Sequence, residues 1–310
     1  MDNRILGIHH ITAIAGEAKR NHDFYTRVLG LRLVKKTVNF DDPGTYHFYY
    51  GDGAGSPGTI LTFFPWEGAR PGYTGTGMAT EINYSVPPDS LDFWLSRFRE
   101  RGVRHDAVAE RFGEQLLSFT DPDGLKLNLV APLQADARSP WVAGEIGKAE
   151  ATRGFHSVVL TLKDIKATAD ILTGVFGYEL ISQEGNRYRF RTSAVDTANL
   201  VDLVEEPNGS RGLNSAGTNH HVAFRVKDEQ VLMAFREKIA AMDINITGKV
   251  DRNYFFSLYF REPGGVLFEI ATDNPGFAVD EPLSELGRNL KLPPQYESSR
   301  KQIEEILPVI

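Results

Sequence analysis

The sequence predicts an α+β protein made of four βαβββ modules, in which two pseudo-duplicated halves form two open, curved sheets, or half-barrels. Three observations support this fold: the halves repeat each other, each half divides again, and each unit has one order of strands and helix. The segment at 7–14 matches the segment at 154–161, and the same offset aligns 24–31 with 171–178 without a gap. The two halves are therefore predicted to be copies of one another.

A second comparison divides each half into two modules. Residues 80–84 match 220–224, and residues 121–128 match 262–269. The expected modules are 5–66, 76–132, 152–206 and 216–272. The resulting layout is an N-terminal half at 1–135, a linker at 136–151, a C-terminal half at 152–272 and a tail at 273–310.

The last module shows the order of elements most clearly. Residues 218–226 are rich in β-branched and aromatic residues, which is typical of a strand. Residues 230–242 carry apolar side chains at helical spacing. A turn at 262–265, with one proline and two glycines, precedes the closing strand. The module is therefore a strand, a helix and a set of strands.

Glycines mark the ends of two other predicted elements. In the first and third modules, an apolar helical face ends at Gly30 or Gly177, where a left-handed residue is expected to terminate the helix. The glycine-rich loops at 51–58 and 68–77 are candidates for the rim of a pocket. The tail is expected to be extended and then helical near 298–307.

The composition limits the classes of partner. The chain has 310 residues, of which 41% are hydrophobic, and its net charge of −7 disfavours nucleic acid or an anionic membrane as a partner. It has no cysteine, so disulfides and thiolate metal sites are excluded. No apolar run has membrane-spanning length, and no signal segment is evident. We expect a cytoplasmic protein, with a homo-oligomer left open.

Two histidine doublets occupy equivalent places in the first and last modules. The first histidine of a doublet has equivalents at His9, His156 and His220, but the second histidine occurs only at His10 and His221. The other two modules carry Glu81 and Ser157 there. Because successive strand residues face opposite sides, we expect only one histidine of each doublet to face the site.

The closing strands supply the third predicted ligand. Glu269 aligns with Asn128, approximately with Phe63 and loosely with Leu203, so one module alone places a carboxylate there. His10, His221 and Glu269 are therefore predicted to bind one metal ion. This ligand set with open positions is typical of non-haem Fe(II) oxygenases, but it also binds catalytic zinc. The alternative is that each doublet is a chance pair, with one histidine in the core and one at the surface.

Seven segments resemble the vicinal oxygen chelate superfamily, which includes glyoxalases and extradiol dioxygenases, and most closely its hydroquinone-type ring-cleaving dioxygenases. The segments are 7–12, 33–43, 46–52, 61–66, 218–224, 268–273 and 292–297. The resemblance covers nearly the whole chain. It implies that His10, His221 and Glu269 are iron ligands.

The same resemblance implies further site residues, namely His9, His220, Thr12, Arg252 and Tyr259. In simpler interpretations, Tyr259 is one aromatic residue of a strand and Arg252 is a solvated loop charge. We expect His22, His47 and His105 to be structural or surface residues.

The predicted function is Fe(II)-dependent cleavage of a hydroquinone-like or catecholic ring by O2, with Mn, Zn or Ni able to occupy the site in a purified sample. His9 or His220 would accept the substrate proton, and Tyr259 or Arg252 would stabilise developing charge. The alternatives are a glyoxalase-like metal-dependent lyase or isomerase, and a non-catalytic small-molecule binding protein. Isomerases of this superfamily generally use four protein ligands, and Phe63 near the fourth position disfavours that class.

The ligand assignment also predicts how the modules pair. The three ligands come from the first and fourth modules, so these two modules must form one sheet. The second and third modules would then form the other sheet, without a metal. The sequence does not specify the ring substituents.

Overall fold

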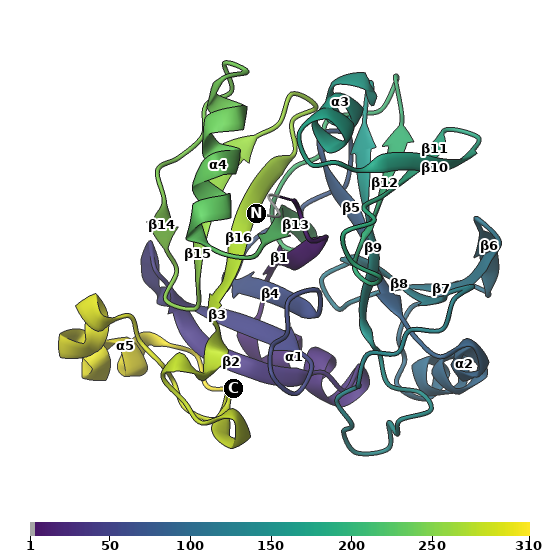
Figure 1. Ribbon diagram of the computed structural model, residues 1–310. Helices are drawn as coiled ribbons and strands as arrows, with labels where there is room; N and C mark the ends of the chain where they lie inside the picture. Colours follow the sequence, from purple (N-terminus) through teal and green to yellow (C-terminus); the bar gives the residue numbers. More distant parts are fainter. Residues whose placement is uncertain (1–3) are drawn as a thin grey trace.

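The computed structural model describes residues 4–310, in which each module has the predicted order of elements (Figure 1). The first module contains β1 (Ile8–Ala15), α1 (Ala18–Asp23), the π-helix η1 (Phe24–Val28), β2 (Arg32–Asn39), β3 (Asp42–Gly51) and β4 (Ile60–Pro65). The second contains β5 (Met78–Ser85), η2 (Pro88–Ser90), α2 (Leu91–Glu100), β6 (Ala109–Arg111), β7 (Glu114–Thr120) and β8 (Lys126–Ala131).

The third and fourth modules repeat this order. The third contains β9 (Gly154–Leu162), α3 (Lys166–Gly174), β10 (Glu179–Glu184), β11 (Arg187–Arg191) and β12 (Leu200–Glu205). The fourth contains β13 (Thr218–Val226), α4 (Glu229–Ala240), β14 (Val250–Asp251), β15 (Phe255–Arg261) and β16 (Leu267–Pro275). The tail holds the short helices η3 (Phe277–Val279), η4 (Leu283–Glu285) and η5 (Pro294–Ser299), followed by α5 (Arg300–Ile306).

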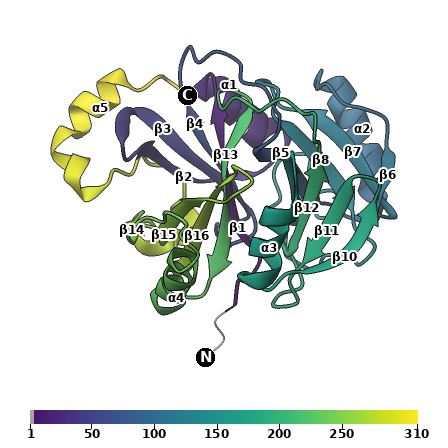
Figure 2. The same cartoon turned by 90° about the horizontal axis from the view of Figure 1, so that it is seen from above.

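The strands form two curved eight-stranded sheets, which lie side by side in Figure 2. The first sheet has the order β14-β15-β16-β13-β1-β4-β3-β2, and the second has the order β10-β11-β12-β9-β5-β8-β7-β6. Antiparallel pairing of β1 with β13 joins the first and fourth modules, and pairing of β5 with β9 joins the second and third. The predicted fold class and module pairing are confirmed.

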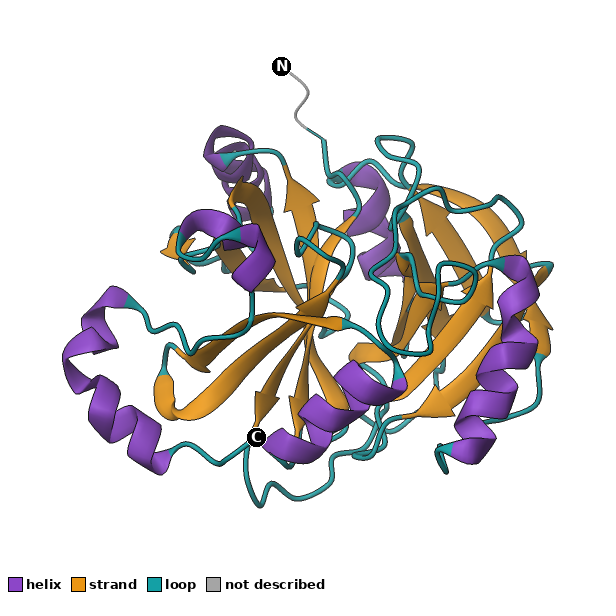
Figure 3. Ribbon diagram, turned by 90° about the horizontal axis from the view of Figure 1, so that it is seen from below, coloured by secondary structure: helices purple, strands orange, loops and turns teal. Residues whose placement is uncertain are grey.

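Helices cover the outside of the sheets and leave the opposite face for a site (Figure 3). Helix α4 buries Leu232 and Phe235, and the Phe235 ring lies 5.9 Å from that of Phe176. Strand β13 adds Val222 and Phe224 to this core. Burying each such side chain contributes about 1.5–3 kcal/mol, which fixes one face of β13 against the helices. Because side chains alternate along a strand, His221 then projects from the other face.

Gly30 shows why a glycine ends the first helical segment. Its φ is +70°, and a β-carbon there would lie 2.5 Å from Ile146 Cδ1. Ile146 belongs to residues 132–153, which connect the halves without a named strand or helix and bury the Ile146 and Ala151 side chains almost completely. Gly177 also has positive φ, at +77°.

The tail packs against the β2–β3 hairpin. The Tyr296 hydroxyl donates to the Phe40 carbonyl at 2.7 Å, and the Lys291 amide donates to the Lys36 carbonyl at 2.9 Å. Lys35 is fully buried, and its ammonium lies 2.6 Å from both Asp280 and Glu281. These contacts hold the tail against the β2–β3 hairpin. None of the helices in residues 4–310 is long and apolar enough to cross a membrane.

Both glycine-rich loops line pockets, but not the cavity of the candidate site: Gly51 borders one pocket, and Gly68 and Pro71 border another. The loop at 68–77 also pairs with residues 211–216 through isolated bridges at Pro71, Tyr73 and Thr76. Gly75 permits this approach, because a β-carbon there would lie 2.4 Å from the Ser210 carbonyl oxygen. The loop thus holds the two halves together.

Candidate metal centre

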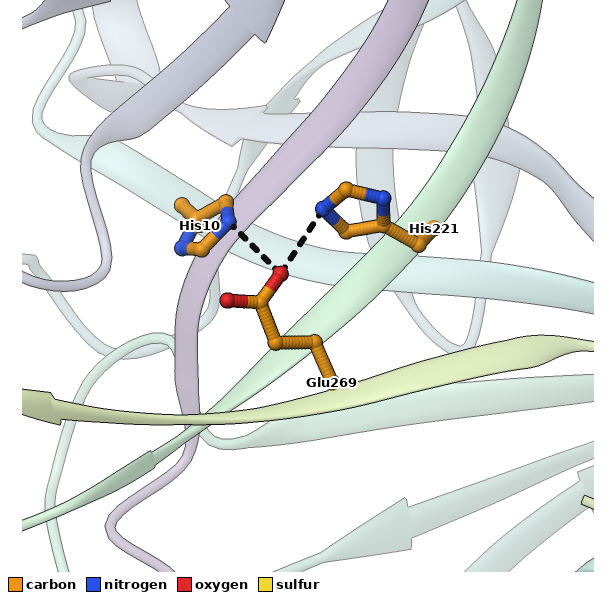
Figure 4. Close-up of side chains that lie close together, drawn as sticks. All are labelled: His10, His221 and Glu269. Carbon is orange, nitrogen blue, oxygen red and sulfur yellow. Dashed lines mark ion pairs between the residues drawn. The ribbon is translucent and has the colours of Figure 1, made fainter. Parts of the chain in front are cut away.

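The structure brings His10, His221 and Glu269 together on one face of the first sheet (Figure 4). They come from β1, β13 and β16, which are neighbouring strands. Glu269 Oε2 lies 3.2 Å from His10 Nε2 and 2.8 Å from His221 Nε2. All three side chains are buried, and their ligand atoms lie within 4.8 Å of one another.

This geometry fits a bound metal ion. Two ligands at about 2.1 Å from an ion, set at right angles, are about 3.0 Å apart, which is close to both measured distances. Glu269 Oε2 is buried, and within residues 4–310 it has no hydrogen-bond partner of acceptable geometry. A buried carboxylate is costly unless a cation compensates it. These three residues therefore form a group that could hold a divalent metal.

The electrostatic environment keeps the carboxylate charged. Burial would raise the pKa of Glu269, but the His10 and His221 rings hold this pKa well below its usual value. The other carboxylate oxygen, Oε1, accepts a hydrogen bond from the Ser257 hydroxyl. Burial lowers the pKa of His221, which favours the neutral imidazole that metals require.

The first histidine of each doublet contacts the second. His9 Nδ1 lies 2.9 Å from His10 Nδ1, and His220 Nδ1 lies 2.8 Å from His221 Nδ1. Each contact occupies the ring nitrogen that faces away from Glu269. A partner on one nitrogen orients a ligand ring and fixes which nitrogen is free to bind metal.

These contacts correct the prediction that neighbouring histidines are separated by the sheet. An irregularity in the β1–β13 pairing between Ile8 and His10 allows the His9 and His10 rings to touch. His9 still lies outside the cavity, behind His10, whereas His220 and His221 both line the cavity. Burial lowers the pKa of His9 and brings that of His220 to about 3, so both rings are neutral at pH 7.

A cavity of about 380 Å³ opens over the three residues, a size typical of small-molecule sites. Its polar wall includes Thr12, His220, Arg252 and Tyr259, all of which the resemblance implied. Aromatic and apolar side chains form much of the remainder, namely Phe40, Tyr49, Phe64, Trp66, Phe255 and Leu267. The cavity can therefore hold a flat, mostly apolar ring against the candidate ligands.

Arg252 and Tyr259 form a pair on the cavity wall. Tyr259 is registered opposite Glu269 in the β15–β16 ladder, and its ring centroid lies 5.7 Å from that of His221. Arg252 Nε donates to the Tyr259 hydroxyl at 3.0 Å. Burial raises the pKa of Tyr259, so its hydroxyl stays protonated. Arg252 is half-buried here, so its placement differs from that of a solvated loop charge.

The sheet register corrects two predicted alignments. Thr12 pairs with Thr62 as Ala223 pairs with Glu269, so the counterpart of Glu269 in the first module is Thr62 and not Phe63. In the third module, the same comparison gives Asp202 and not Leu203. A shift of one residue turns a side chain to the other face. Phe63 accordingly lies in the core, whereas Thr62 faces the cavity side.

His47 is the main site residue that the sequence analysis missed. It was expected to be structural or at the surface, but it is half-buried and lines the cavity with Asn39 and Asp41. The available signal was internal symmetry, because Tyr49 faces Thr62 in β3–β4 as Tyr259 faces Glu269 in β15–β16. His47 lies two residues before Tyr49, on the same face of β3. The other two histidines, His22 and His105, are both half-buried and lie away from the cavity.

Comparison with known proteins agrees with this fold. The model of the Glyoxalase/Bleomycin resistance protein/Dioxygenase superfamily matches residues 7–129 and 154–270. "Putative ring-cleaving dioxygenase MhqO" of Bacillus subtilis (strain 168) is 47% identical over 98% of this chain and 96% of its own length. "Chlorohydroquinone/hydroquinone 1,2-dioxygenase" of Sphingobium indicum is 33% identical over 98% of this chain and 96% of its own length.

A solved structure from Bacillus subtilis subsp. subtilis str. 168 has a TM-score of 0.95 and 46% sequence identity, and it covers 99% of this chain and 98% of its own. The family model and these relatives extend over both halves and include every strand of the first sheet that carries a candidate ligand. The chain belongs to the Glyoxalase/Bleomycin resistance protein/Dioxygenase superfamily.

Proposed function

We propose that the protein is a ring-cleaving dioxygenase that uses Fe(II) and O2 to open a hydroquinone-like aromatic diol. The observation that carries this proposal is the group of two imidazoles and one carboxylate in a cavity walled by aromatic side chains. Three protein ligands leave positions for a substrate oxygen and O2, as in non-haem Fe(II) oxygenases. The names of the relatives support ring cleavage as the reaction.

His10, His221 and Glu269 would hold the iron. When bound, Fe(II) lowers the pKa of a ring hydroxyl and allows O2 to react with the ring. Mn, Zn or Ni could occupy the same ligands in a purified sample, because affinity alone does not select the metal.

The cavity residues have separate roles in this proposal. The aromatic wall orients the ring beside the candidate ligands, which reduces the entropic cost of reaction. Arg252 and the protonated Tyr259 hydroxyl donate toward oxygen atoms on which negative charge develops. His220 lines the cavity as a neutral ring and can accept a proton, whereas His9 orients His10 from behind.

The fourth ligand position favours this function over that of a glyoxalase-like isomerase. Thr62 stands there, and its hydroxyl already contacts Thr12 and His47. An isomerase site with four protein ligands would need a carboxylate, imidazole or comparable donor at that position. A binding protein without chemistry would not need the buried group of three ligands.

Oxygen consumption tests the proposal. Apo protein would be loaded with Fe(II) under anaerobic conditions and mixed with O2 and methylhydroquinone, with catechol as a second substrate. We expect one O2 consumed per diol and a ring-opened product by mass spectrometry. The Glu269→Gln variant, treated identically, should consume no O2 above background. Iron-loaded wild-type protein that turns over no hydroquinone or catechol would contradict the proposal.

A further inference from the structure

Four side chains form a continuous hydrogen-bonded chain across the first sheet. Thr12 Oγ1 lies 2.9 Å from Thr62 Oγ1, which lies 3.0 Å from His47 Nε2. His47 Nδ1 lies 2.9 Å from the Tyr49 hydroxyl. The chain therefore runs from β1 through β4 to β3, and every link has hydrogen-bond length.

Three members of this chain, Thr12, His47 and Tyr49, line the cavity, but Thr62 does not. Thr12 and Tyr49 line the cavity, and Thr12 is paired with His221 across the β1–β13 ladder. Thr62 is fully buried and is absent from the cavity wall. A proton entering at one end can thus reach the other end without crossing the cavity.

The chain has two consistent arrangements of hydrogens. In one, Thr12 donates to Thr62, Thr62 to His47 and His47 to Tyr49, so the Tyr49 hydroxyl is free to donate into the cavity. In the other, every bond is reversed, and the Thr12 hydroxyl is the free donor. Each hydroxyl and the neutral imidazole can donate and accept, so both arrangements satisfy every member. The two arrangements differ by the transfer of one proton between the ends.

We propose that Thr12, Thr62, His47 and Tyr49 form a proton relay that takes the proton of a bound diol at the Thr12 end and releases one at the Tyr49 end. The inference rests on the proposed function, because the proton comes from an aromatic diol. His47 and Thr62 are positioning residues in this scheme, since they act through the two end residues.

The transfer balances at each atom. The substrate O–H bond breaks, and Thr12 Oγ1 gains that proton while giving its own to Thr62 Oγ1. Thr62 gives its proton to His47 Nε2, and His47 gives the Nδ1 proton to Tyr49. Tyr49 then gives its hydroxyl proton to an oxygen in the cavity, and all four residues end neutral. Ring opening by O2 adds two oxygen atoms and removes no hydrogen, so the displaced proton has to return to the product.

His47 is suited to passing a proton on and not to retaining it as an imidazolium. Burial lowers the pKa of His47 well below its usual value, and the nearby His10, Arg252 and His221 lower it further, against an opposing effect of Glu269. An imidazolium is therefore unfavourable, and a proton gained at one nitrogen is released from the other. The ring is held between Tyr49 and Phe64, with centroids 4.1 and 4.3 Å away.

Internal symmetry places this relay at the position equivalent to that of Glu269. Thr62 is the counterpart of Glu269, and His47 is the counterpart of Ser257. In the fourth module, the Ser257 hydroxyl supports the carboxylate. In the first module, the corresponding contact joins two members of the relay. At these equivalent positions, the fourth module contributes the candidate ligand Glu269, and the first module contributes Thr62 and His47 of the relay.

Thr62→Val tests the relay, because valine keeps the shape of threonine and removes the central hydroxyl. The matched control is Thr80→Val, which breaks the buried Thr80–Thr161 contact of 2.8 Å in the second sheet. We expect Thr62→Val to lower kcat by about a hundredfold, the low end of the contribution of general acid–base catalysis, with iron content unchanged and KM within about threefold. Thr80→Val should leave kcat unchanged. Thr62→Ser, which restores a hydroxyl, should recover most of the rate.

Two readouts separate a relay from packing. In mixtures of H2O and D2O, wild-type kcat should show a curved dependence on deuterium content from several moving protons, and Thr62→Val should lose that curvature. His47→Phe, which keeps a ring between Tyr49 and Phe64, should behave like Thr62→Val. Full kcat in Thr62→Val, or a loss equal in Thr62→Ser, would overturn the relay.

An anaerobic measurement tests the relay apart from ring cleavage. Iron-loaded protein is mixed with a nitro-substituted diol, whose ionised form absorbs visible light, and ionisation is followed by stopped flow. We expect about a hundredfold slower ionisation in Thr62→Val than in the wild type or Thr80→Val. Equal rates in all three would overturn the relay even if oxygen consumption confirms the dioxygenase. Slowing in Thr62→Val alone would support the relay even if the ring is not cleaved.

Discussion

The two sheets share one backbone plan but carry different side chains at equivalent places. In the first sheet, the four positions facing the centre are His10, His221, Glu269 and Thr62. In the second, they are Glu81, Ser157, Asn128 and Asp202. The first set has three candidate metal ligands beside a cavity, whereas the side chains of the second set form hydrogen bonds and ion pairs within the protein.

The second sheet compensates its charges within the protein. Asp202 is fully buried and forms a two-point ion pair with Arg189, at 2.8 and 2.9 Å. Arg189 also lies 2.6 Å from Glu114, whose other oxygen lies 3.0 Å from His156. In the first sheet, the buried Glu269 faces the His10 and His221 rings instead, at 3.2 and 2.8 Å. Each sheet thus has four convergent positions, and their side chains determine whether they form a candidate metal site or a network of ion pairs.

The largest expected effect is loss of metal from the first sheet. His10→Ala and His221→Ala each remove one of three candidate ligands, so stoichiometric iron binding and turnover should be abolished, with a fall in iron affinity of about a thousandfold or more. The matched control is His156→Ala, which removes a buried histidine from the second sheet. Iron content by mass spectrometry checks this. Retention of one iron per chain in His10→Ala would contradict the ligand assignment.

Removing the cation of the second sheet should mainly affect stability. Arg189→Met leaves Asp202 and Glu114 as buried carboxylates without their guanidinium, which should lower the free energy of unfolding by about 3–5 kcal/mol. Iron stoichiometry of the folded variant should stay at the wild-type value. Denaturant unfolding of the metal-free protein measures the first effect. Glu269→Gln is the control, because it should lose iron while the apo protein keeps nearly wild-type stability.

The fold could be predicted from the sequence because the repeats are ungapped near their helices and opening strands. The closing strands were misaligned by one residue at Thr62 and Asp202. Strands β4 and β12 are buried along nearly their whole length, so they lack the apolar–polar alternation from which register can be inferred.

Uncertain strand register also limited how much of the candidate site could be predicted. The three candidate ligands were identifiable because two of them lie in histidine doublets at equivalent places in the repeats, and the third is the one carboxylate at its position in the closing strands. The structure brings all three together. His47 was not identifiable, because its place in the wall depends on the register of Thr62 against Tyr49. The contact between His9 and His10 was also unexpected, since it depends on a local irregularity in pairing that alternation rules do not predict.

A third prediction concerns acid stability of the second sheet. Burial would raise the pKa of Glu114, but His156 and Arg189 lower it to about 2 in the folded protein, from 4.5. A lowered folded-state pKa stabilises the protein above the unfolded-state value, and this stability is lost as the pH falls from about 4.5 toward 2. The contribution is on the order of 3 kcal/mol. Unfolding free energies of the wild type should fall across this window more steeply than those of Glu114→Gln, and equal slopes would contradict this role of Glu114.

The smallest expected effect comes from His9 and His220, the histidines that contact the candidate ligands. His9→Ala and His220→Ala remove the Nδ1 contacts at 2.9 and 2.8 Å but leave all three candidate ligands in place. Loss of such a supporting partner typically lowers metal affinity or activity by 10- to 100-fold, because the ligand ring is less well oriented. We therefore expect both variants to bind iron at saturating Fe(II), with affinity reduced within that range by competition with a chelator. His220→Ala should also lower kcat, because His220 lines the cavity and His9 does not. An affinity loss in His9→Ala as large as in His10→Ala would mean that the two neighbouring rings exchange roles, and the orientation assigned to β1 would then be wrong.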